Sequence, residues 1–293
     1  MAHQFERTFR VRHYECDAYE TVYYTNYLRY IQETAMDASA DAGFGGEWYA
    51  AQGRIWLVRD TKIAFLEPLR YGDAVCVRTW VQDMRASMSK RAYELRRVRD
   101  DVIVARAETD WAYIDTTTGR PARIPAEIRD ALVDPDLPYK PRESFPSAPS
   151  SPASSFTQRR RVEWRDIDPA QHVNNSVYLA YAEDCAVETD AAFGWTQARM
   201  RASGFALAYT EFRIDYRQSA VFGDSLDITS WLSNVDGGHA VRHFELVRVS
   251  DGAQVARVRA VMTCRSVEGG SPLPMHPAYI QDIQPIITEE TLT

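Results

Sequence analysis

The sequence repeats itself at one fixed spacing, and this repeat limits the possible folds more than any other feature. Asp17 and Asp168 lie 151 positions apart (168 − 17), and the same spacing relates Trp80 to Trp231. Two longer matches at this spacing pair Gly72-Asp73 with Gly223-Asp224, and Val104–Arg106 with Val255–Arg257. A spacing that persists over this length predicts two copies of one fold, each long enough to bury a core of its own.

The boundary between the copies is marked by composition. Residues 134–156 read DPDLPYKPRESFPSAPSSPASSF and are rich in Pro and Ser. Proline cannot donate to a β-ladder, and such a stretch has little apolar surface to bury. We therefore predict a linker at 134–156 between a first domain, 1–133, and a second domain, 157–293.

The two copies have the same predicted order of elements. In the first copy we expect a strand at Phe5–Arg12, a helix at about Tyr24–Asp41, and strands near 54–67, 73–83, 89–99 and 102–115. In the second copy we expect a strand from about 157, a helix at about 175–192, and strands near 205–218, 224–235, 239–250 and 254–266. An apolar stripe at helical spacing supports the first helix, and it consists of Leu28, Ile31, Ala35 and Met36. Gly43 is expected to end that helix.

One helix followed by a long antiparallel meander is an α+β arrangement. The helix has an apolar stripe and small residues such as Ala38 and Ala182, which allow a sheet to approach closely. A curved sheet wrapped around such a helix is the hotdog architecture. The sequence therefore predicts tandem hotdog repeats that form an intramolecular double hotdog.

Composition excludes several classes of partner. The net charge is −7, whereas a nucleic-acid-binding protein needs a basic surface. No apolar run approaches the roughly 20 residues that a membrane span requires, so we expect no membrane association. The four cysteines lack the paired spacing of a zinc or redox motif. We therefore expect free buried thiols in a cytoplasmic protein, with no metal and no cofactor.

Arginines gather in three short clusters, which are Arg96-Arg97 with Arg99, Arg159–Arg161, and Arg199 with Arg201. One interpretation is a docking site for an anionic carrier such as coenzyme A or an acidic carrier protein. The alternative, solvated strand edges and helix ends, is the commoner role of any single cluster.

Two segments resemble the active-site segments of acyl thioesterases. Tyr14–Asp17 together with Val22–Leu28 is similar to the segment of the 4-hydroxybenzoyl-CoA thioesterase family in which an Asp precedes the hotdog helix. Trp164–Asp168 together with His172–Asn175 resembles the second half of the acyl-ACP thioesterases, which are themselves double hotdogs. The resemblance implies an acyl thioesterase of lipid metabolism that acts on acyl-CoA or acyl-ACP, with double-hotdog units that assemble into homo-oligomers.

The chemistry of such a site is simple. Thioester hydrolysis needs a group that stabilises an oxyanion and a carboxylate that attacks the carbonyl or activates water. A helix N-terminus offers backbone N–H groups and a positive dipole end, so we expect the carbonyl to lie at Tyr24 in the first copy and at Asn175 in the second. Asp17 and Asp168, each seven residues upstream, are the candidate bases or nucleophiles.

The copies differ around the shared Asp. His172 has no counterpart, because position 21 is Thr, and it either contacts substrate or water or only holds the loop. Asn174 and Asn175 replace Tyr23 and Tyr24, and these amides either bind the carrier arm or cap the helix. We include Tyr23, Asn26 and Asn174 as candidate substrate-binding residues on the basis of the resemblance. Glu33 and Asp184 share one helix position, away from the N-terminus, and we expect them to form structural ion pairs.

Departures from the plant-type pattern leave open which copy is active. The second copy has Ala170 where acyl-ACP thioesterases have Asn, and Ser219-Ala220 where they have Glu-Cys. Two alternatives to hydrolysis remain, a hotdog hydratase or dehydratase and a non-catalytic acyl-thioester binding module. The hydratase motif places His five residues after Asp, whereas His172 follows Asp168 by four.

Overall fold

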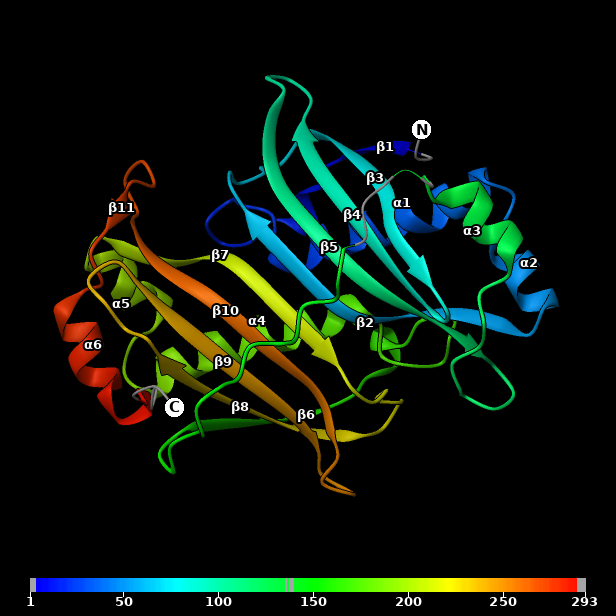
Figure 1. The fold of residues 1–293 in the computed structure, drawn as a ribbon. Coiled ribbons are helices and arrows are strands. Elements are labelled where there is room, and N and C mark those ends of the chain that lie inside the picture. Colours follow the sequence, from blue (N-terminus) through cyan, green and yellow to red (C-terminus); the bar gives the residue numbers. More distant parts are fainter. Residues whose placement is uncertain (1–3, 135, 137–139, 289–293) are drawn as a thin grey trace. The chain divides into compact units, whose positions relative to one another are not determined.

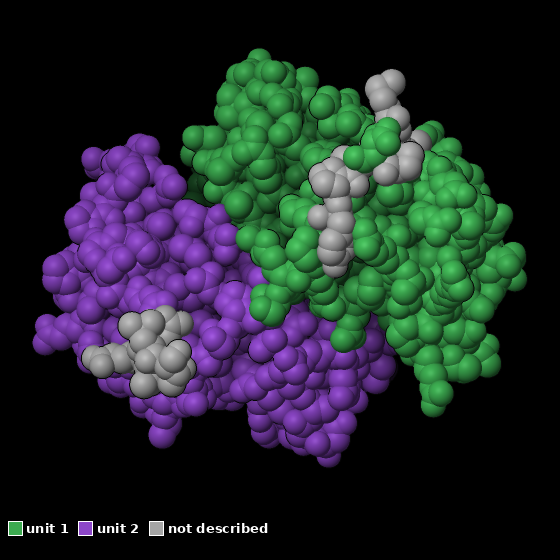
Figure 2. Space-filling model, in the orientation of Figure 1, with its two compact units in different colours: residues 1–144 green, residues 145–293 purple. Residues whose placement is uncertain are grey.

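The structure is a computed structural model that describes residues 4–134, 136 and 140–288 (Figure 1). It divides into two compact units, Met1–Ser144 (unit 1) and Phe145–Thr293 (unit 2), which Figure 2 colours separately. The division falls inside the predicted linker, 134–156. The finer domain bounds, 1–133 and 157–293, stay a prediction.

Unit 1 is a five-stranded antiparallel sheet with one long helix. The strands are β1 (Gln4–Arg10), β2 (Arg54–Phe65), β3 (Ala74–Arg85), β4 (Met88–Arg97) and β5 (Val102–Asp115), in the spatial order β1-β3-β4-β5-β2. The helix α1 (Tyr24–Asp41) packs against β1 and β3. Each strand is rich in β-branched and aromatic residues, which suit a pleated, half-buried surface.

Unit 2 repeats this arrangement. The strands are β6 (Phe156–Arg161), β7 (Phe205–Tyr216), β8 (Ser225–Ser233), β9 (His239–Arg248) and β10 (Gln254–Ser266), in the order β7-β10-β9-β8-β6, with β11 (Pro272–Leu273) beside β10. The helix α4 (Asn175–Ala192) packs against β6 and β8. The α+β class and the tandem repeat of one helix and one antiparallel sheet are confirmed.

Several short elements were not predicted. They are α2 (Gly46–Ala51), α3 (Ala126–Leu132), α5 (Gln197–Ala202), α6 (Pro277–Ile283) and the 3₁₀ turns η1 (His13–Glu15), η2 (Trp164–Asp166) and η3 (Gln284–Ile286). None is longer than two helical turns, so none leaves a periodic apolar pattern that a sequence window can detect.

Among the described residues, no helix combines the length and the apolar content that crossing a lipid bilayer requires.

The predicted apolar stripe of α1 is correct in three of its four members. Leu28, Ile31 and Ala35 are buried, whereas the Met36 side chain is 54% exposed. The buried face also includes Tyr27 and the small polar residues of the helix, and this face points away from Met36. The prediction for Met36 was therefore wrong, because an apolar residue was counted although it lies across the helix from the buried face.

The end of each long helix follows the predicted signal. Gly43 has φ +93° and Gly194 has φ +82°, so both adopt the left-handed conformation that glycine accepts without strain. These glycines occupy equivalent places in the repeat and turn the chain toward α2 and α5.

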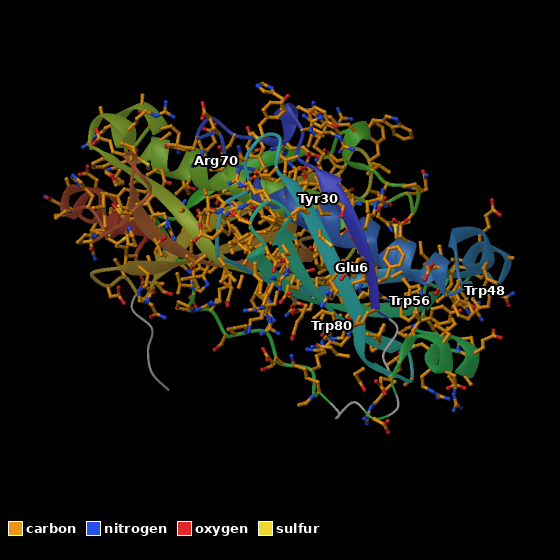
Figure 3. All side chains as sticks on the ribbon, turned by 90° about the horizontal axis from the view of Figure 1, so that it is seen from above. Glu6, Tyr30, Trp48, Trp56, Arg70 and Trp80 are labelled. Atoms are coloured by element: carbon orange, nitrogen blue, oxygen red, sulfur yellow. The ribbon has the colours of Figure 1, made fainter. Side chains whose placement is uncertain are left out.

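An aromatic cluster fills one end of unit 1. Tyr49 of α2 contacts the rings of Trp48, Trp56 and Tyr113 edge to face. Figure 3 labels Trp48 and Trp56 at this end and Arg70 at the other end of the unit. The Arg70 backbone bridges to Thr21, in the loop that carries Asp17. The loop end and the aromatic end of unit 1 are therefore distinct.

The predicted linker makes specific contacts. On the unit 1 side Lys140 pairs with Glu108, and Arg142 with Asp110 at 2.9 Å. On the unit 2 side the ring of Phe145 lies 4.2 Å from the guanidinium carbon of Arg257. Residues 140–155 form no helix or strand, as the Pro and Ser content predicts, whereas Phe156 already begins β6.

Candidate active site

Asp17 is held inside its own loop by three hydrogen bonds. Its Oδ1 accepts the backbone N–H of Tyr19 at 2.8 Å and that of Thr21 at 3.0 Å, and its Oδ2 accepts the Thr21 hydroxyl at 3.1 Å. The Asp17 N–H donates to the carbonyl of Thr21 at 2.8 Å, which closes the loop. Glu20 adopts φ +61° to allow this closure. The carboxylate is therefore fixed in position by its own loop.

Asp168 occupies the same loop in unit 2. Its Oδ1 accepts the N–H of Ala170 at 2.9 Å, and its own N–H donates to the carbonyl of His172 at 2.9 Å. Gln171 has φ +65°, which matches the strained position of unit 1. Oδ2 accepts a longer bond of 3.3 Å from Nδ2 of Asn174. Thr21 provides the corresponding contact in unit 1, so the two loops share a shape and differ in the residue that closes them.

Backbone contacts bring each Asp next to the start of its helix. In unit 1 the N–H of Tyr23, the N-cap residue of α1, donates to the carbonyl of Glu15 at 3.0 Å. In unit 2 the N–H of Asn174, the N-cap residue of α4, donates to the carbonyl of Asp166 at 2.9 Å. The predicted grouping of Asp17 with Tyr24, and of Asp168 with Asn175, is thus present as one short closed loop ahead of each helix.

Two buried carboxylates anchor these loops, and the sequence analysis missed them. Glu15 accepts the hydroxyl of Tyr30 from α1 at 2.6 Å, and Asp166 accepts that of Tyr181 from α4 at 2.6 Å. Burial, followed by the hydrogen bond to the acid, raises the pKa of both tyrosines, so both phenols stay protonated. Both pairs recur at the spacing of the repeat, which is the signal in the sequence that could have identified them.

A second pair of tyrosines anchors the turn beside each loop. The hydroxyl of Tyr27 accepts the N–H of Leu69 at 3.0 Å, and the hydroxyl of Tyr178 accepts the N–H of Ala220 at 3.0 Å. Burial raises the pKa of Tyr178 to about 12. These tyrosines are part of the framework that fixes the loop, and both lie deep in the core.

Asn174 caps its helix, which is one of the two predicted alternatives. Its Oδ1 accepts the N–H of Ser176 at 3.0 Å and the hydroxyl of Ser176 at 2.7 Å. Because its Nδ2 contacts Asp168, the side chain connects the acid to the helix N-terminus. In unit 1 Tyr23 occupies the N-cap position and makes no side-chain cap. The two helix N-termini are therefore chemically unlike.

The remaining candidates lie at different depths. The Tyr24 ring packs edge to face on Phe65 at 4.7 Å, at the first turn of α1. Asn26 is buried, and its Nδ2 donates to the Glu15 carbonyl at 3.0 Å while its Oδ1 accepts from Arg29 at 2.9 Å. The Asn26 amide is therefore committed to holding the loop, a framework contact within unit 1.

In unit 2 the candidates beside Asp168 are only partly covered. Asn175 begins α4, and its backbone carbonyl accepts the Tyr216 hydroxyl at 3.0 Å. His172 is half-buried, and its Nδ1 is covered without a hydrogen-bond partner among the described residues. The side-chain hydrogen bond to Asp168 comes from Asn174.

The predicted ion pairs of the helix acids are present. Glu33 lies 3.5 Å from the Arg7 guanidinium, and Asp184 pairs with Arg160. Both arginines come from the edge strand that crosses the helix, β1 or β6. These acids therefore join helix to sheet and lie outside the candidate site.

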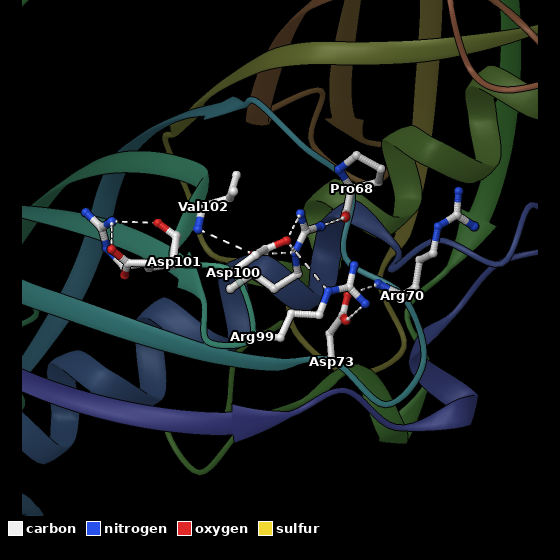
Figure 4. A network of polar contacts seen from close by, with 9 residues as sticks. Pro68, Arg70, Asp73, Arg99, Asp100, Asp101 and Val102 are labelled. Carbon is white, nitrogen blue, oxygen red and sulfur yellow. Dashed lines mark hydrogen bonds and ion pairs between the residues drawn. The ribbon is translucent and has the colours of Figure 1, made fainter.

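The first arginine cluster is largely neutralised by neighbouring acids (Figure 4). Arg97 donates to Asp100, and Arg99 pairs with Asp73 at 2.9 Å. The Arg70 backbone N–H also donates to Asp73, whereas no contact is drawn at the Arg70 guanidinium. These pairs stabilise the two turns in which the cluster lies, and docking of an anionic carrier there stays a prediction.

Within residues 4–134, 136 and 140–288, no three His, Cys, Asp or Glu side chains lie close enough together to hold a metal ion. All four cysteines are free thiols; Cys185 and Cys264 are buried, and Cys16 and Cys76 are half-buried. Burial raises the pKa of Cys185 to about 11, so that thiol stays protonated near neutral pH.

Two protein-family models match the chain, one in each half. Residues 2–132 match the acyl-ACP thioesterase N-terminal domain, and residues 162–283 match the thioesterase-like superfamily. Each half of the chain therefore matches a family model of thioesterases. Both matches include the loop that carries Asp17 or Asp168 and the helix that follows it.

The curated relatives of this chain include plant proteins. A palmitoyl-acyl carrier protein thioesterase of Gossypium hirsutum is 24% identical over 270 residues, covering 87% of this chain and 62% of its own. A dodecanoyl-[acyl-carrier-protein] hydrolase of Cinnamomum camphora is 24% identical and covers 87% of this chain and 66% of its own. The chain thus spans less than two thirds of the length of these relatives.

Solved structures share the double-hotdog fold. An oleoyl thioesterase (putative) from Lactobacillus plantarum superposes with a TM-score of 0.72 at 19% identity, covering 89% of this chain and 96% of its own. The 12:0-ACP thioesterase from Umbellularia californica superposes with a TM-score of 0.71 at 21% identity, covering 91% and 98%. At this identity the likeness concerns the fold.

Proposed function

We propose that the chain hydrolyses an acyl thioester to a free acid and a thiol. The observation that carries this proposal is the fixed carboxylate ahead of a helix N-terminus, present once in each unit of a chain whose halves each match a family model of thioesterases. A carboxylate and a set of backbone N–H groups are the two components that thioester hydrolysis needs. The names of the curated relatives, which are thioesterases and hydrolases, support it.

The proposed reaction begins with the thioester carbonyl at the N-terminus of the helix. Water attacks the carbonyl carbon and gives its proton to the Asp carboxylate. Backbone N–H groups and the helix dipole stabilise the negative oxygen of the tetrahedral intermediate. The C–S bond then breaks, the thiolate takes the proton from Asp, and the acid leaves. In the nucleophilic variant of this mechanism, Asp attacks the carbonyl carbon and expels the thiolate as the C–S bond breaks; water then hydrolyses the resulting mixed anhydride, which frees the acid and Asp and supplies the proton for the thiol.

Within this proposal Asp17 is the principal base, with Tyr24 marking the carbonyl site. The supporting observation comes from unit 2, where the Asn174 side chain contacts both Asp168 and Ser176. The Asn174 side chain therefore occupies both an oxygen of Asp168 and the Ser176 N–H at the helix terminus where a carbonyl would bind. Unit 2 also lacks the Asn and Glu-Cys positions of the plant-type pattern.

A second site in unit 2 has one observation in its favour. His172 lies in the loop of Asp168 and has a covered Nδ1 without a partner among the described residues. A substrate or a water molecule could accept or donate there. Asp168, His172 and Asn175 are therefore the second candidate set, weighed against Asp17 by the experiment below.

The proposed carrier is acyl carrier protein or coenzyme A. Acyl carrier protein is supported by the names of the plant relatives, which include this carrier. Tyr23 and Asn174, at the two N-cap positions, are the proposed contacts to the carrier arm, and Asn26 acts behind them. A cytoplasmic location, which suits free thiols, and assembly into homo-oligomers complete the proposal.

Release of free thiol from acyl-CoA and acyl-ACP, measured with a thiol reagent over a series of chain lengths, tests the proposal. We expect turnover by the wild-type protein and none above background in a variant that combines Asp17→Asn and Asp168→Asn. Unchanged hydrolysis in that variant contradicts the mechanism. Binding of thioesters without turnover would support a binding module, and loss of enoyl absorbance with a crotonyl thioester would support a hydratase.

A further inference from the structure

Unit 1 contains a buried arginine that has no acidic partner among the described residues. Arg91 lies on β4 and is only 6% exposed, yet its one hydrogen bond among the described residues is a 3.4 Å contact to the Thr79 hydroxyl. A guanidinium has five N–H donors, so most of its hydrogen-bonding capacity is unused. The ionisable groups that favour its charged form are Tyr93 and Tyr49, and both are phenols.

Unit 2 shows the contact that unit 1 lacks. Arg242 is the equivalent of Arg91 in the repeat (242 − 91 = 151) and is completely buried. Its guanidinium pairs with Asp190 of α4 and donates to the Ala186 carbonyl at 3.0 Å and to Tyr279 at 2.9 Å. The residue of α1 equivalent to Asp190 is Ser39. The arginine is thus present in both units, and its counter-ion is present in one.

The electrostatic consequence is opposite in the two units. Burial lowers the pKa of Arg91. Burial also opposes the charge of Arg242, but the negative charge of Asp190 outweighs it and raises the pKa well above the usual value. Arginine does not give up its proton in proteins, so Arg91 remains a buried cation. A buried charge without a partner is strongly unfavourable, and a bound anion would remove that penalty.

We propose that Arg91 binds a carboxylate at the far end of the acyl group, so that the substrate of unit 1 is a long-chain ω-carboxyacyl thioester. That this ligand is a substrate rests on the proposed thioester hydrolysis. That Arg91 binds a carboxylate rests only on the buried cation. The guanidinium would form a two-pronged, charge-assisted pair with the carboxylate, the arrangement for which its planar shape is suited.

The distance between the helix N-terminus and the place expected for Arg91 fits this assignment. Ser39 lies fifteen residues after Tyr24 on α1, which corresponds to about 22 Å at the helical rise of 1.5 Å per residue. Ser39 contacts the Tyr49 hydroxyl at 2.8 Å, and Tyr49 belongs to the aromatic cluster at the end away from Arg70 (Figure 3). The repeat places Arg91 opposite Ser39, as Arg242 lies opposite Asp190 in unit 2, so we infer that about this length, that of a long acyl chain, separates Arg91 from the helix N-terminus.

The side chains around Arg91 are polar, whereas a methyl-terminated acyl chain needs an apolar surface. The Tyr93 hydroxyl contacts the Thr109 hydroxyl at 2.9 Å, and the Trp111 indole N–H donates to the same hydroxyl at 2.6 Å. Thr109 is also the β5 partner of Arg91 in the sheet. A methyl-terminated chain would have to lie against this polar surface without using its hydrogen bonds.

The direct test compares binding of hexadecanedioic acid with binding of palmitic acid, a monocarboxylic acid of the same length, by thermal shift and calorimetry. We expect the wild-type protein to bind the diacid roughly tenfold more tightly, because one buried charge-assisted pair is gained. Ser39→Asp supplies the counter-ion found in unit 2 and should abolish this preference, whereas Ser39→Asn, similar in size but uncharged, should retain it.

Three outcomes overturn the inference. Equal affinity for the two acids in the wild-type protein is the first, and a preference that survives both Ser39→Asp and Arg91→Met is the second. The third is stabilisation by acetate that depends on Arg91 without any preference for the diacid, since it would mean a site for small anions only. The two substitutions at Ser39 keep the test valid if Arg91→Met does not fold.

Turnover separates this inference from the proposed function. The ratio of kcat/KM for the ω-carboxyacyl-CoA and palmitoyl-CoA should exceed roughly tenfold in the wild-type protein and approach one in Ser39→Asp. If neither thioester is hydrolysed, the proposed function fails while the binding comparison still tests Arg91. If both are hydrolysed equally well in both proteins, hydrolysis stands and the ω-carboxyacyl assignment fails.

Discussion

In unit 1 the loop before the helix is closed by Thr21, and in unit 2 the equivalent acid is held by Asn174, which also caps the helix. Behind both loops the framework is the same, with a buried acid bonded to a helix tyrosine. The contacts common to both units are therefore those that the fold requires. The contacts that differ lie where a substrate would bind, so the unlike positions are the ones to mutate.

The largest expected difference between the units is catalytic. Asp17→Asn should lower kcat/KM for thioester hydrolysis by about 10²–10⁴-fold, the usual contribution of a positioned base. Asp168→Asn should lower it less than roughly tenfold, because unit 2 is the second candidate. Thiol release under single-turnover conditions measures both. The reverse order of effects would move the active site to unit 2.

Removing a charge at the two buried arginine sites should have opposite effects on the free energy of unfolding. Asp190→Ser leaves Arg242 unpaired in the core and should lower the free energy of unfolding by about 3–5 kcal/mol. Arg91→Met removes a cation that has no partner among the described residues, so it should leave that free energy unchanged or raise it. Urea denaturation compares the two variants. Equal destabilisation would mean that Arg91 has a counter-ion of its own.

A histidine in unit 2 should make stability depend on pH. Burial, together with the charge of Arg259, lowers the pKa of His243 to about 4, and its Nε2 lies 2.8 Å from the Ser233 hydroxyl. As the pH falls below about 6.5 the unfolded chain takes up a proton that the folded chain refuses. Stability should therefore fall between pH 6.5 and 4, by about 3 kcal/mol in total.

Denaturation of His243→Gln across the same pH range provides the control. The variant should lose that part of the pH dependence, and the equivalent residue of unit 1, Ala92, contributes none. If the variant and the wild-type protein have the same pH profile, His243 titrates normally in the folded state.

The smallest expected effect concerns the helix cap. Asn174→Ala removes the acceptor of the Ser176 N–H and should destabilise the protein by about 1 kcal/mol. Asn174→Ser restores a capping hydroxyl but not the amide that donates to Asp168. Thermal unfolding of the two variants should therefore show a larger loss for alanine. Equal losses would mean that the contact to Asp168, and not the cap, stabilises unit 2.

The sequence predicted the long elements well because their signals are strong and local. The helices expected at 24–41 and 175–192 are α1 and α4 as observed. An apolar stripe at helical spacing indicated α1, its place in the repeat indicated α4, and a glycine follows the end of each. Strand positions agree to within a few residues. The short helices were missed because a single turn has no period. Met36 was misplaced because hydrophobicity alone does not define the buried face of a helix.

The candidate site was predicted in part. Asp17 and Asp168 were selected as candidates because they recur in a recognised motif, and their catalytic role stays a prediction. Glu15 and Asp166 recur as well, but an acid beside a turn resembles any solvated residue until its tyrosine partner is located. The burial of Arg91 could not be predicted, because a charged residue in an alternating strand is ordinarily assigned to the exposed face.

The strained backbone of the two loops has a consequence for how the acid works. Glu20 and Gln171 are held at positive φ although neither is glycine, a conformation of order 1 kcal/mol above relaxed backbone. That energy is supplied during folding, before any substrate arrives. For the hydrolysis proposed above, Asp17 then meets the thioester already oriented, so little reorganisation accompanies the reaction itself.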